Sequence, residues 1–84
     1  MFYVYVLRSL KDKQLYIGST NNLKKRFLDH NRGAVLSTKL RKPFELLYYE
    51  AYKMEKDARH REKNLKLGST ALRQLKRRLP TCLK

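Results

Sequence analysis

The first twenty residues constrain the fold most strongly, because they predict a β-hairpin. Phe2–Leu7 is rich in aromatic and β-branched residues, which favour a strand. Lys11–Lys13 is a polar turn, and Leu15–Thr20 has the character of a second strand. Gly18 lies inside that second strand, where glycine usually marks a bulge or a close approach to the backbone. Any fold of this chain must therefore accommodate an antiparallel strand pair at its N-terminal end.

The pattern then changes to that of a helix. Thr20–Asn22 contains good N-cap residues, and the apolar Leu23 and Phe27 are four positions apart, as on one helix face. Gly33 stands where the C-cap of this helix is expected. The hairpin is thus followed by a short helix of about three turns.

The remaining residues predict one strand and two helices. Residues 34–43 form a basic loop, and Phe44–Tyr52 is a third strand. A second helix is expected at about Lys53–Leu67, stopped by Gly68, and a third helix follows a Ser69 cap and ends at Pro80. The inward-facing residues of these two helices are predicted to be Met54, Ala58, Leu65, Ala71, Leu72, Leu75 and Leu79. The order β-β-α-β-α-α predicts a small α/β (α+β) domain with a three-stranded antiparallel sheet flanked by helices.

Length and charge limit the classes of function. Eighty-four residues allow one domain, residues 1–84, and 21 Lys and Arg against 7 Asp and Glu give a net charge of +14. The single cysteine, Cys82, excludes an internal disulfide and a four-cysteine zinc site, and a catalytic role for it is not expected. Without a signal-like start or a long apolar run, we expect a cytoplasmic protein with no membrane partner. Such a charge favours a polyanion such as nucleic acid.

The hairpin carries tyrosines that are candidates for chemistry. Tyr3 and Tyr5 share one face of the first strand, and Tyr16 lies on the second strand. A phenol both donates and accepts a hydrogen bond, and nearby cations would lower its pKa and make it a usable base. The alternative is that these tyrosines are ordinary core or edge residues of the sheet.

The first helix offers a cation and an imidazole together. Arg26 and His30 are four positions apart and therefore share a helix face. Arginine suits phosphate binding, and histidine can act as a general acid or base near neutral pH. The alternative interpretation is a solvated helix face without a catalytic role.

A carboxylate continues the apolar stripe of the second helix. Glu62 follows Ala58 by four positions, so it is aligned with buried residues and needs a cation. That cation could be a divalent metal such as Mg²⁺, which binds oxygen ligands, or a salt-bridge partner such as Lys66 or Arg59. Glu50, at the end of the third strand, is a competing metal ligand. We find no P-loop, dinucleotide-binding or zinc motif.

Short motifs follow one another at a recognisable spacing. They are Tyr3-Val4-Tyr5, then Tyr16-Ile17-Gly18, then the segment from Asn21 to Asn31, and finally Arg59–Lys66. Together they resemble the GIY-YIG nuclease family over about Phe2 to Gly68, most closely its small stand-alone, excision-nuclease-like members. Two departures are visible: Tyr3 replaces the first glycine, and residues 67–84 lack the asparagine that many members carry after the glutamate helix. Asn64 is too close to Glu62 to be taken as that asparagine.

The resemblance implies a metal-dependent endonuclease that hydrolyses phosphodiester bonds of DNA, single-stranded or structured DNA included. It implies one Mg²⁺ or Mn²⁺ and no organic cofactor. The implied site residues are Tyr5 and Tyr16 as paired phenols, Gly18 packed beside them, Arg26 on the scissile phosphate, His30 in proton transfer and Glu62 on the metal.

Surface cations and tyrosines suggest how nucleic acid would be held. The basic residues expected to follow its backbone are Lys39, Arg41, Lys42, Arg73, Lys76, Arg77 and Arg78, although the same residues could simply form a soluble surface. Tyr48, Tyr49 and Tyr52 could stack unpaired bases. The rival functions are a non-catalytic basic DNA- or RNA-binding module that retains the fold, and a small ribosome-associated protein. The sequence does not indicate an oligomeric state.

Overall fold

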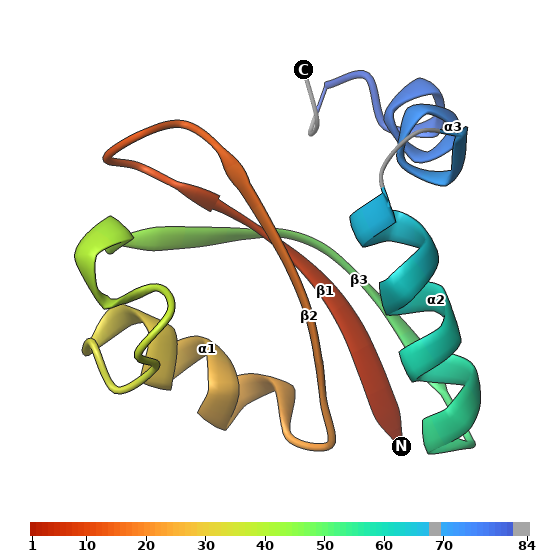
Figure 1. Ribbon diagram of the computed structural model, residues 1–84, viewed down its shortest axis with the longest axis horizontal. Helices are drawn as coiled ribbons and strands as arrows, with labels where there is room; N and C mark the ends of the chain where they lie inside the picture. Colours follow the sequence, from red (N-terminus) through yellow and green to blue (C-terminus); the bar gives the residue numbers. More distant parts are fainter. Residues whose placement is uncertain (68–69, 82–84) are drawn as a thin grey trace.

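The sheet forms the centre of the computed structural model, which describes residues 1–67 and 70–81 (Figure 1). Its strands are β1 (Phe2–Ser9), β2 (Leu15–Thr20) and β3 (Phe44–Tyr52), in the spatial order β2-β1-β3. Both pairings are antiparallel, and the register of β1 with β3 shifts after Val6. The expected hairpin and third strand are confirmed, and β1 occupies the middle position.

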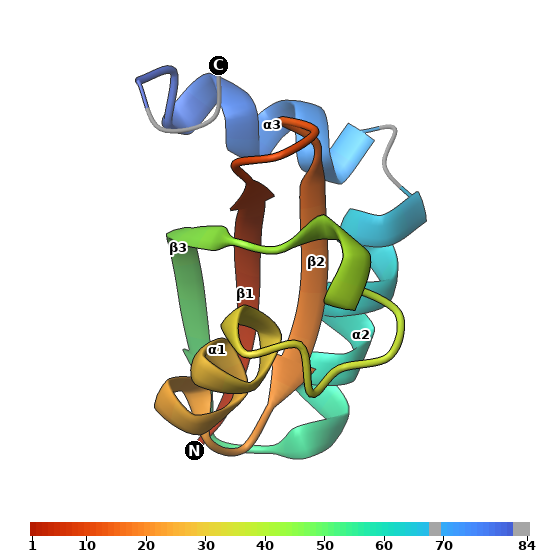
Figure 2. The ribbon, with the colours of Figure 1, turned by 90° about the vertical axis from the view of Figure 1, so that its left-hand side faces the viewer.

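Helices cover both faces of the sheet. Helix α1 (Leu23–Asn31) and the short 3₁₀ helix η1 (Lys39–Arg41) lie on one face, and α2 (Glu55–Leu67) lies on the other (Figure 2). Helix α3 (Thr70–Arg78) continues on the side of α2. The order β-β-α-β-α-α and the α+β class agree with the sequence-based expectation.

Alternation along β1 creates a separate core on each face. Val4 and Val6 pack with Ala58 and Leu65 of α2 and with Leu75 of α3. The neighbouring residues point the other way, so that Tyr5 and Leu7 pack with Phe44 beneath α1. Because successive strand side chains point to opposite faces, the central strand is buried on both sides. Tyr5 thereby becomes a buried residue of the α1 face.

Local signals place the ends of α1. The Asn22 side chain accepts a hydrogen bond from the backbone N–H of Lys25 at 3.1 Å and caps the helix start. After Asn31 the chain turns at Gly33, whose φ of +79° is a left-handed conformation that glycine adopts without strain. The Asn22 cap and the stop at Gly33 are confirmed, although the C-cap residue itself is Arg32 and Gly33 follows it. These two ends set the position of His30 in the last turn.

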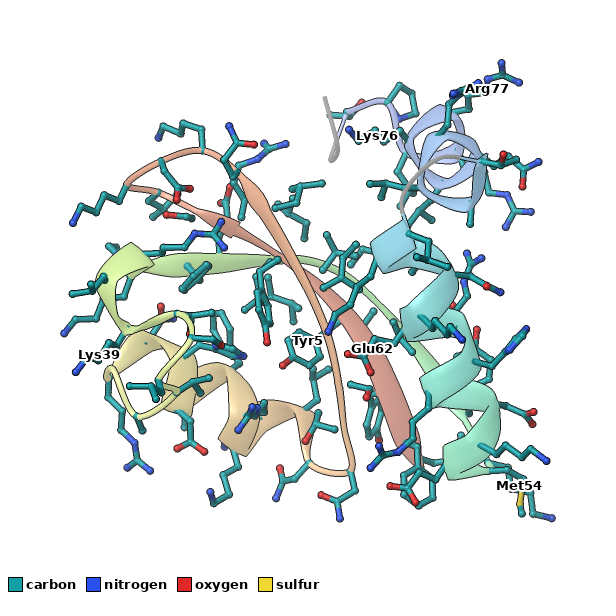
Figure 3. All side chains as sticks on the ribbon, viewed as in Figure 1. Tyr5, Lys39, Met54, Glu62, Lys76 and Arg77 are labelled. Carbon is teal, nitrogen blue, oxygen red and sulfur yellow. The ribbon has the colours of Figure 1, made fainter. Side chains whose placement is uncertain are left out.

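Two boundaries and the direction of one side chain differ from the sequence-based expectation. Strand β1 extends to Ser9 rather than Leu7, because the Ser9 side chain and backbone organise the hairpin turn. Helix α2 begins at Glu55 rather than Lys53. Met54 was expected to face the core but is 58 % exposed, since it precedes the helix and points away from the sheet (Figure 3). The predicted stop at Gly68, the Ser69 cap and Cys82 lie outside the described residues.

Candidate active site

A hydrogen bond joins the central strand to α1 at the heart of the candidate site. The Tyr5 hydroxyl lies 2.9 Å from His30 Nε2, and these side chains are 1 % and 0 % exposed. Residues 25 positions apart in the chain are brought together because β1 turns Tyr5 toward the face that α1 covers. The structure therefore pairs a phenol with an imidazole in a place shielded from water.

Gly18 provides the room for the Tyr5 ring. It lies opposite Tyr5 in the β1–β2 register. A Cβ atom at position 18 would come 2.5 Å from the Tyr5 hydroxyl oxygen and 2.7 Å from Cζ. Such distances lie far inside van der Waals contact, so any other residue would push the ring from its place. The glycine in β2 thus marks a close approach of a side chain to the backbone.

Tyr16 lies beside this pair and is more accessible. Its ring centroid is 5.0 Å from that of His30 and 6.4 Å from that of Tyr5. Tyr16 is half-buried, so one part of its ring faces the aromatic cluster while solvent reaches another part. The two tyrosines expected to form a pair are therefore neighbours with different exposure.

Thr38 holds the second nitrogen of His30. Its Oγ1 lies 2.7 Å from His30 Nδ1, and the threonine is buried although it belongs to the basic loop. Sequence reasoning treated this loop only as a source of cations and missed the threonine. A hydroxyl residue between exposed neighbours carries no periodic signal, so only the folded loop reveals the contact.

Burial dominates the electrostatics of the Tyr5–His30 pair. It raises the pKa of Tyr5 to about 12, although the nearby Arg26 guanidinium opposes the shift. Burial also lowers the pKa of His30 to about 4, and the positive charge of Arg26 adds to that effect. The expectation that nearby cations lower the phenol pKa is wrong for Tyr5, because desolvation outweighs the arginine. Near neutral pH both side chains are uncharged.

Glu62 approaches from the opposite face of the sheet. Ser19 Oγ donates to Glu62 Oε1 at 2.5 Å, and Lys66 Nζ lies 2.7 Å from Oε2. Burial raises the pKa of the Glu62 carboxyl, but the hydrogen bonds from Lys66 and Ser19 outweigh burial and hold this pKa below its ordinary value. The carboxylate is ionised and 19 % exposed. The Lys66 salt bridge considered from the sequence is present, and Ser19 is a partner that the sequence reasoning missed.

One hollow lies at the end of β2, and a second lies along α2. One, of about 300 Å³, is lined by Ser19, Arg26 and Arg59, among others. The other, of about 430 Å³, is lined by Arg59, Glu62 and Lys66 together with two neighbouring residues of α2. Arg59 lines both hollows and shares the first of them with Arg26. Sequence reasoning considered Arg59 only as an ion-pair partner of Glu62.

Comparison with known proteins identifies the family. The family model described as the GIY-YIG catalytic domain matches residues 1–79. The chain belongs to the GIY-YIG family. This family is one of nucleases.

The curated relatives of this GIY-YIG chain are UPF0213 proteins. The UPF0213 protein CPE1444 of Clostridium perfringens is 43 % identical over 67 residues, which are 79 % of this chain and 71 % of that protein. The UPF0213 protein SSP2268 of Staphylococcus saprophyticus is 36 % identical over 68 residues, covering 80 % and 82 % of the two chains. The solution NMR structure of the UPF0213 protein BH0048 from Bacillus halodurans is similar with a TM-score of 0.56 and 30 % identity, covering 94 % of this chain and 85 % of that one.

The metal-ligating side chains of the candidate site are compatible with one kind of ion, a hard divalent cation. GIY-YIG nucleases generally depend on a divalent metal. Within residues 1–67 and 70–81, no three His, Cys, Asp or Glu side chains gather as a metal-binding group. Glu62 is an ionised carboxylate at the edge of a hollow, and Mg²⁺ often uses one carboxylate with waters and substrate oxygens. The residues therefore fit a hard divalent ion held by Glu62 once Lys66 releases Oε2.

Glu50, the other metal ligand considered from the sequence, already has hydrogen-bond partners on both carboxylate oxygens. Its carboxylate accepts from Arg61 Nε at 2.9 Å, from Tyr48 at 2.7 Å and from Tyr52 at 2.5 Å. These bonds tie β3 to α2 and use both carboxylate oxygens. The proposed stacking cluster is likewise divided, because Tyr48 and Tyr52 serve Glu50 whereas Tyr49 packs against Tyr3 on the α1 face.

The structure shows which residue the Asn64 side chain contacts. Asn64 Nδ2 lies 3.2 Å from His60 Nε2 on the exposed side of α2. Its side chain is thus occupied away from the carboxylate of Glu62.

The predicted backbone-binding cations occupy two separate regions. Lys39 and Lys42 are exposed on the α1 side, whereas Arg73, Lys76, Arg77 and Arg78 are exposed on α3. Figure 3 shows Lys39 far from Lys76 and Arg77, with Tyr5 and Glu62 between them. Arg41 differs from these residues, because it pairs with Asp12 at 2.7 Å and lies over the Phe44 ring.

No helix within residues 1–67 and 70–81 is long and apolar enough to cross a membrane.

Proposed function

We propose that this GIY-YIG chain is an endonuclease that hydrolyses phosphodiester bonds of DNA with one Mg²⁺ or Mn²⁺. One observation carries the proposal: Tyr5 is hydrogen-bonded to His30 and lies within electrostatic reach of both Arg26 and Glu62. A proton acceptor, a phosphate-binding cation and a metal-binding carboxylate are the groups that phosphodiester hydrolysis needs together. The net charge of +14 supports a nucleic acid as the partner.

Arg26 and Arg59 would bind the scissile phosphate. Both residues line the hollow of about 300 Å³, Arg26 from α1 and Arg59 from α2. A guanidinium can contact two phosphate oxygens at once and can neutralise the charge that grows on them during attack. The exposed lysines and arginines of the loop and α3 would hold the flanking backbone.

Tyr5 would act as a relay rather than as a free base. Its pKa of about 12 keeps the phenol protonated near neutral pH. Once substrate binding brings the attacking water to the phenol oxygen, Tyr5 would take a proton from that water while passing its own proton to His30 Nε2, so that no free phenolate forms. A phosphate bound at Arg26 would offset the charge that helps to lower the His30 pKa. Tyr16, the more accessible phenol, would orient the attacking water.

Glu62 would hold the divalent ion. When bound, such an ion supplies Lewis-acid polarisation of the phosphate and stabilisation of the leaving oxygen. Ser19 keeps one carboxylate oxygen in place through its hydrogen bond. Lys66 neutralises the other oxygen, and it is 51 % exposed, so it can swing into solvent.

Cleavage assays with matched variants test this proposal. Purified chain would be incubated with single-stranded and duplex DNA in Mg²⁺, Mn²⁺ or EDTA. We expect metal-dependent cleavage that falls at least about 100-fold in Glu62→Gln and Arg26→Ala. Asp57→Asn removes an exposed carboxylate from the same helix and should leave the rate unchanged.

The results of these assays distinguish an endonuclease from a non-catalytic nucleic-acid-binding module. No cleavage of any substrate by the wild-type chain would overturn the proposal, and tight DNA binding in that case would indicate the non-catalytic module. Full activity in Glu62→Gln would show that the cleavage comes from a different site.

A further inference from the structure

Thr38 is a buried hydroxyl in an exposed loop. It is 1 % exposed, while Ser37 and Lys39 on either side are exposed. Buried hydroxyl groups need hydrogen-bond partners, and this one has two. Its Oγ1 lies 2.7 Å from His30 Nδ1 and 3.5 Å from the carbonyl oxygen of Val35. The backbone N–H of Thr38 also binds the Val35 carbonyl at 3.1 Å, which fixes this turn.

Thr38, His30 and Tyr5 are joined by successive hydrogen bonds. At the Thr38 end, the donor and the acceptor of each bond can be assigned. The Val35 carbonyl oxygen can only accept, so the threonine hydrogen is turned toward it. Oγ1 is then free to accept, and the short contact with Nδ1 is an N–H donated by His30. A neutral imidazole carries a hydrogen on one nitrogen, which leaves Nε2 as an acceptor.

The Tyr5 end independently requires the same direction. The hydrogen of the buried Tyr5 hydroxyl needs an acceptor, and within residues 1–67 and 70–81 the hydrogen-bond partner of this hydroxyl is His30 Nε2. The phenol therefore directs its hydrogen to His30 Nε2, 2.9 Å away. The opposite tautomer would place two hydrogens between Tyr5 and His30 or leave the phenol hydrogen without an acceptor.

We infer that Thr38 is a positioning residue, whose hydroxyl accepts the Nδ1 hydrogen of His30 and holds Nε2 ready for the Tyr5 proton. It touches neither substrate nor metal and acts through His30. Its effect on turnover rests on the proposed function, but the tautomer that it selects is a property of the free protein. The two can therefore be tested separately.

The tautomer can be measured directly in the free chain. Two-bond ¹H–¹⁵N correlation spectra of the uniformly ¹⁵N-labelled protein near neutral pH distinguish a protonated Nδ1 from a protonated Nε2. We expect His30 to carry its hydrogen on Nδ1 in the wild type and in Thr38→Ser. In Thr38→Val the Nδ1 form should lose its dominance, while Ser37→Ala, a change at the exposed neighbour, should leave it intact. A wild-type His30 protonated on Nε2 would overturn the inference without any variant.

Cleavage kinetics provide a second test, because a purely structural role of Thr38 would not change kcat separately from KM. Thr38→Val should lower kcat about tenfold or more with KM nearly unchanged, and Thr38→Ser should restore kcat. A folded Thr38→Val variant with the wild-type tautomer and kcat would overturn the inference. If no form of the chain cleaves DNA, the proposed function fails, yet the spectra still decide the role of Thr38. If Thr38→Val does not fold, the wild-type and Thr38→Ser spectra remain decisive.

Discussion

Replacing Gly18 by alanine tests the packing on which the candidate site depends. The new Cβ would lie 2.5 Å and 2.7 Å from two atoms of the Tyr5 side chain, where about 3.4 Å or more is ordinary contact. The Tyr5 ring cannot yield easily, because it is 1 % exposed and hydrogen-bonded to His30. Overpacking of a core typically costs about 1–3 kcal/mol, and a weakened hydrogen bond adds about 1 kcal/mol.

We therefore expect Gly18→Ala to lower the free energy of unfolding by about 3 kcal/mol. For a domain of this size that corresponds to a fall in Tm of roughly 10–20 °C. Thermal and denaturant unfolding followed by circular dichroism would measure it. The His30 ring resonances should also move, because the Tyr5 hydroxyl is displaced.

Gly33→Ala is the matched control. Its Cβ would meet the Lys42 side chain only at 3.7 Å, so the expected loss of about 1 kcal/mol comes from the left-handed backbone. In a Tyr5→Leu background, whose side chain is shorter, Gly18→Ala should cost less than in the wild type. Gly18→Ala proving no more harmful than Gly33→Ala would refute the argument.

Further predictions concern pH, an ion pair and a helix cap. His30 has a pKa of about 4 in the folded chain and about 6.5 when unfolded. The free energy of unfolding is therefore highest above pH 6.5, where His30 is neutral in both states, and it decreases as the pH falls toward 4. Denaturant unfolding should therefore show a loss of about 2 kcal/mol between about pH 7.5 and pH 5, and a flat profile there would contradict the buried neutral imidazole. Glu50→Ala should cost roughly 2 kcal/mol, since it leaves Arg61 and two phenols without their acceptor, whereas Glu45→Ala on the same strand should be nearly neutral in the same unfolding assay. Asn22→Ala should cost about 1 kcal/mol through loss of the α1 cap, and Asn22→Asp should restore most of it.

The candidate site joins residues from both faces of one thin sheet. Tyr5 and His30 belong to the α1 face, and Glu62 reaches the other face through Ser19 of β2. Gly18 lies next to Ser19, so the part of β2 that admits the Tyr5 ring also presents the hydroxyl that holds the carboxylate. A change in β2 should consequently affect the proposed proton relay and the proposed metal ligand together.

Local patterns in the sequence determined the elements and the family. The bounds of β2 and β3, the Asn22 cap and the stop at Gly33 follow from strand propensity, capping and backbone conformation, all of which act between near neighbours. The spacing of the tyrosine, arginine, histidine and glutamate motifs was equally visible, since it is written along the chain. The match of the GIY-YIG model to residues 1–79 confirms the family that this spacing indicated.

Only the tertiary structure decided the environment of these residues. Burial raises the Tyr5 pKa where neighbouring cations alone would have lowered it, and burial depends on how α1 covers β1. Ser19 and Glu62 are 43 positions apart, and the Thr38 contact requires the loop to fold back on α1. Desolvation and through-space hydrogen bonds arise from packing between distant segments, so no local pattern could have revealed them.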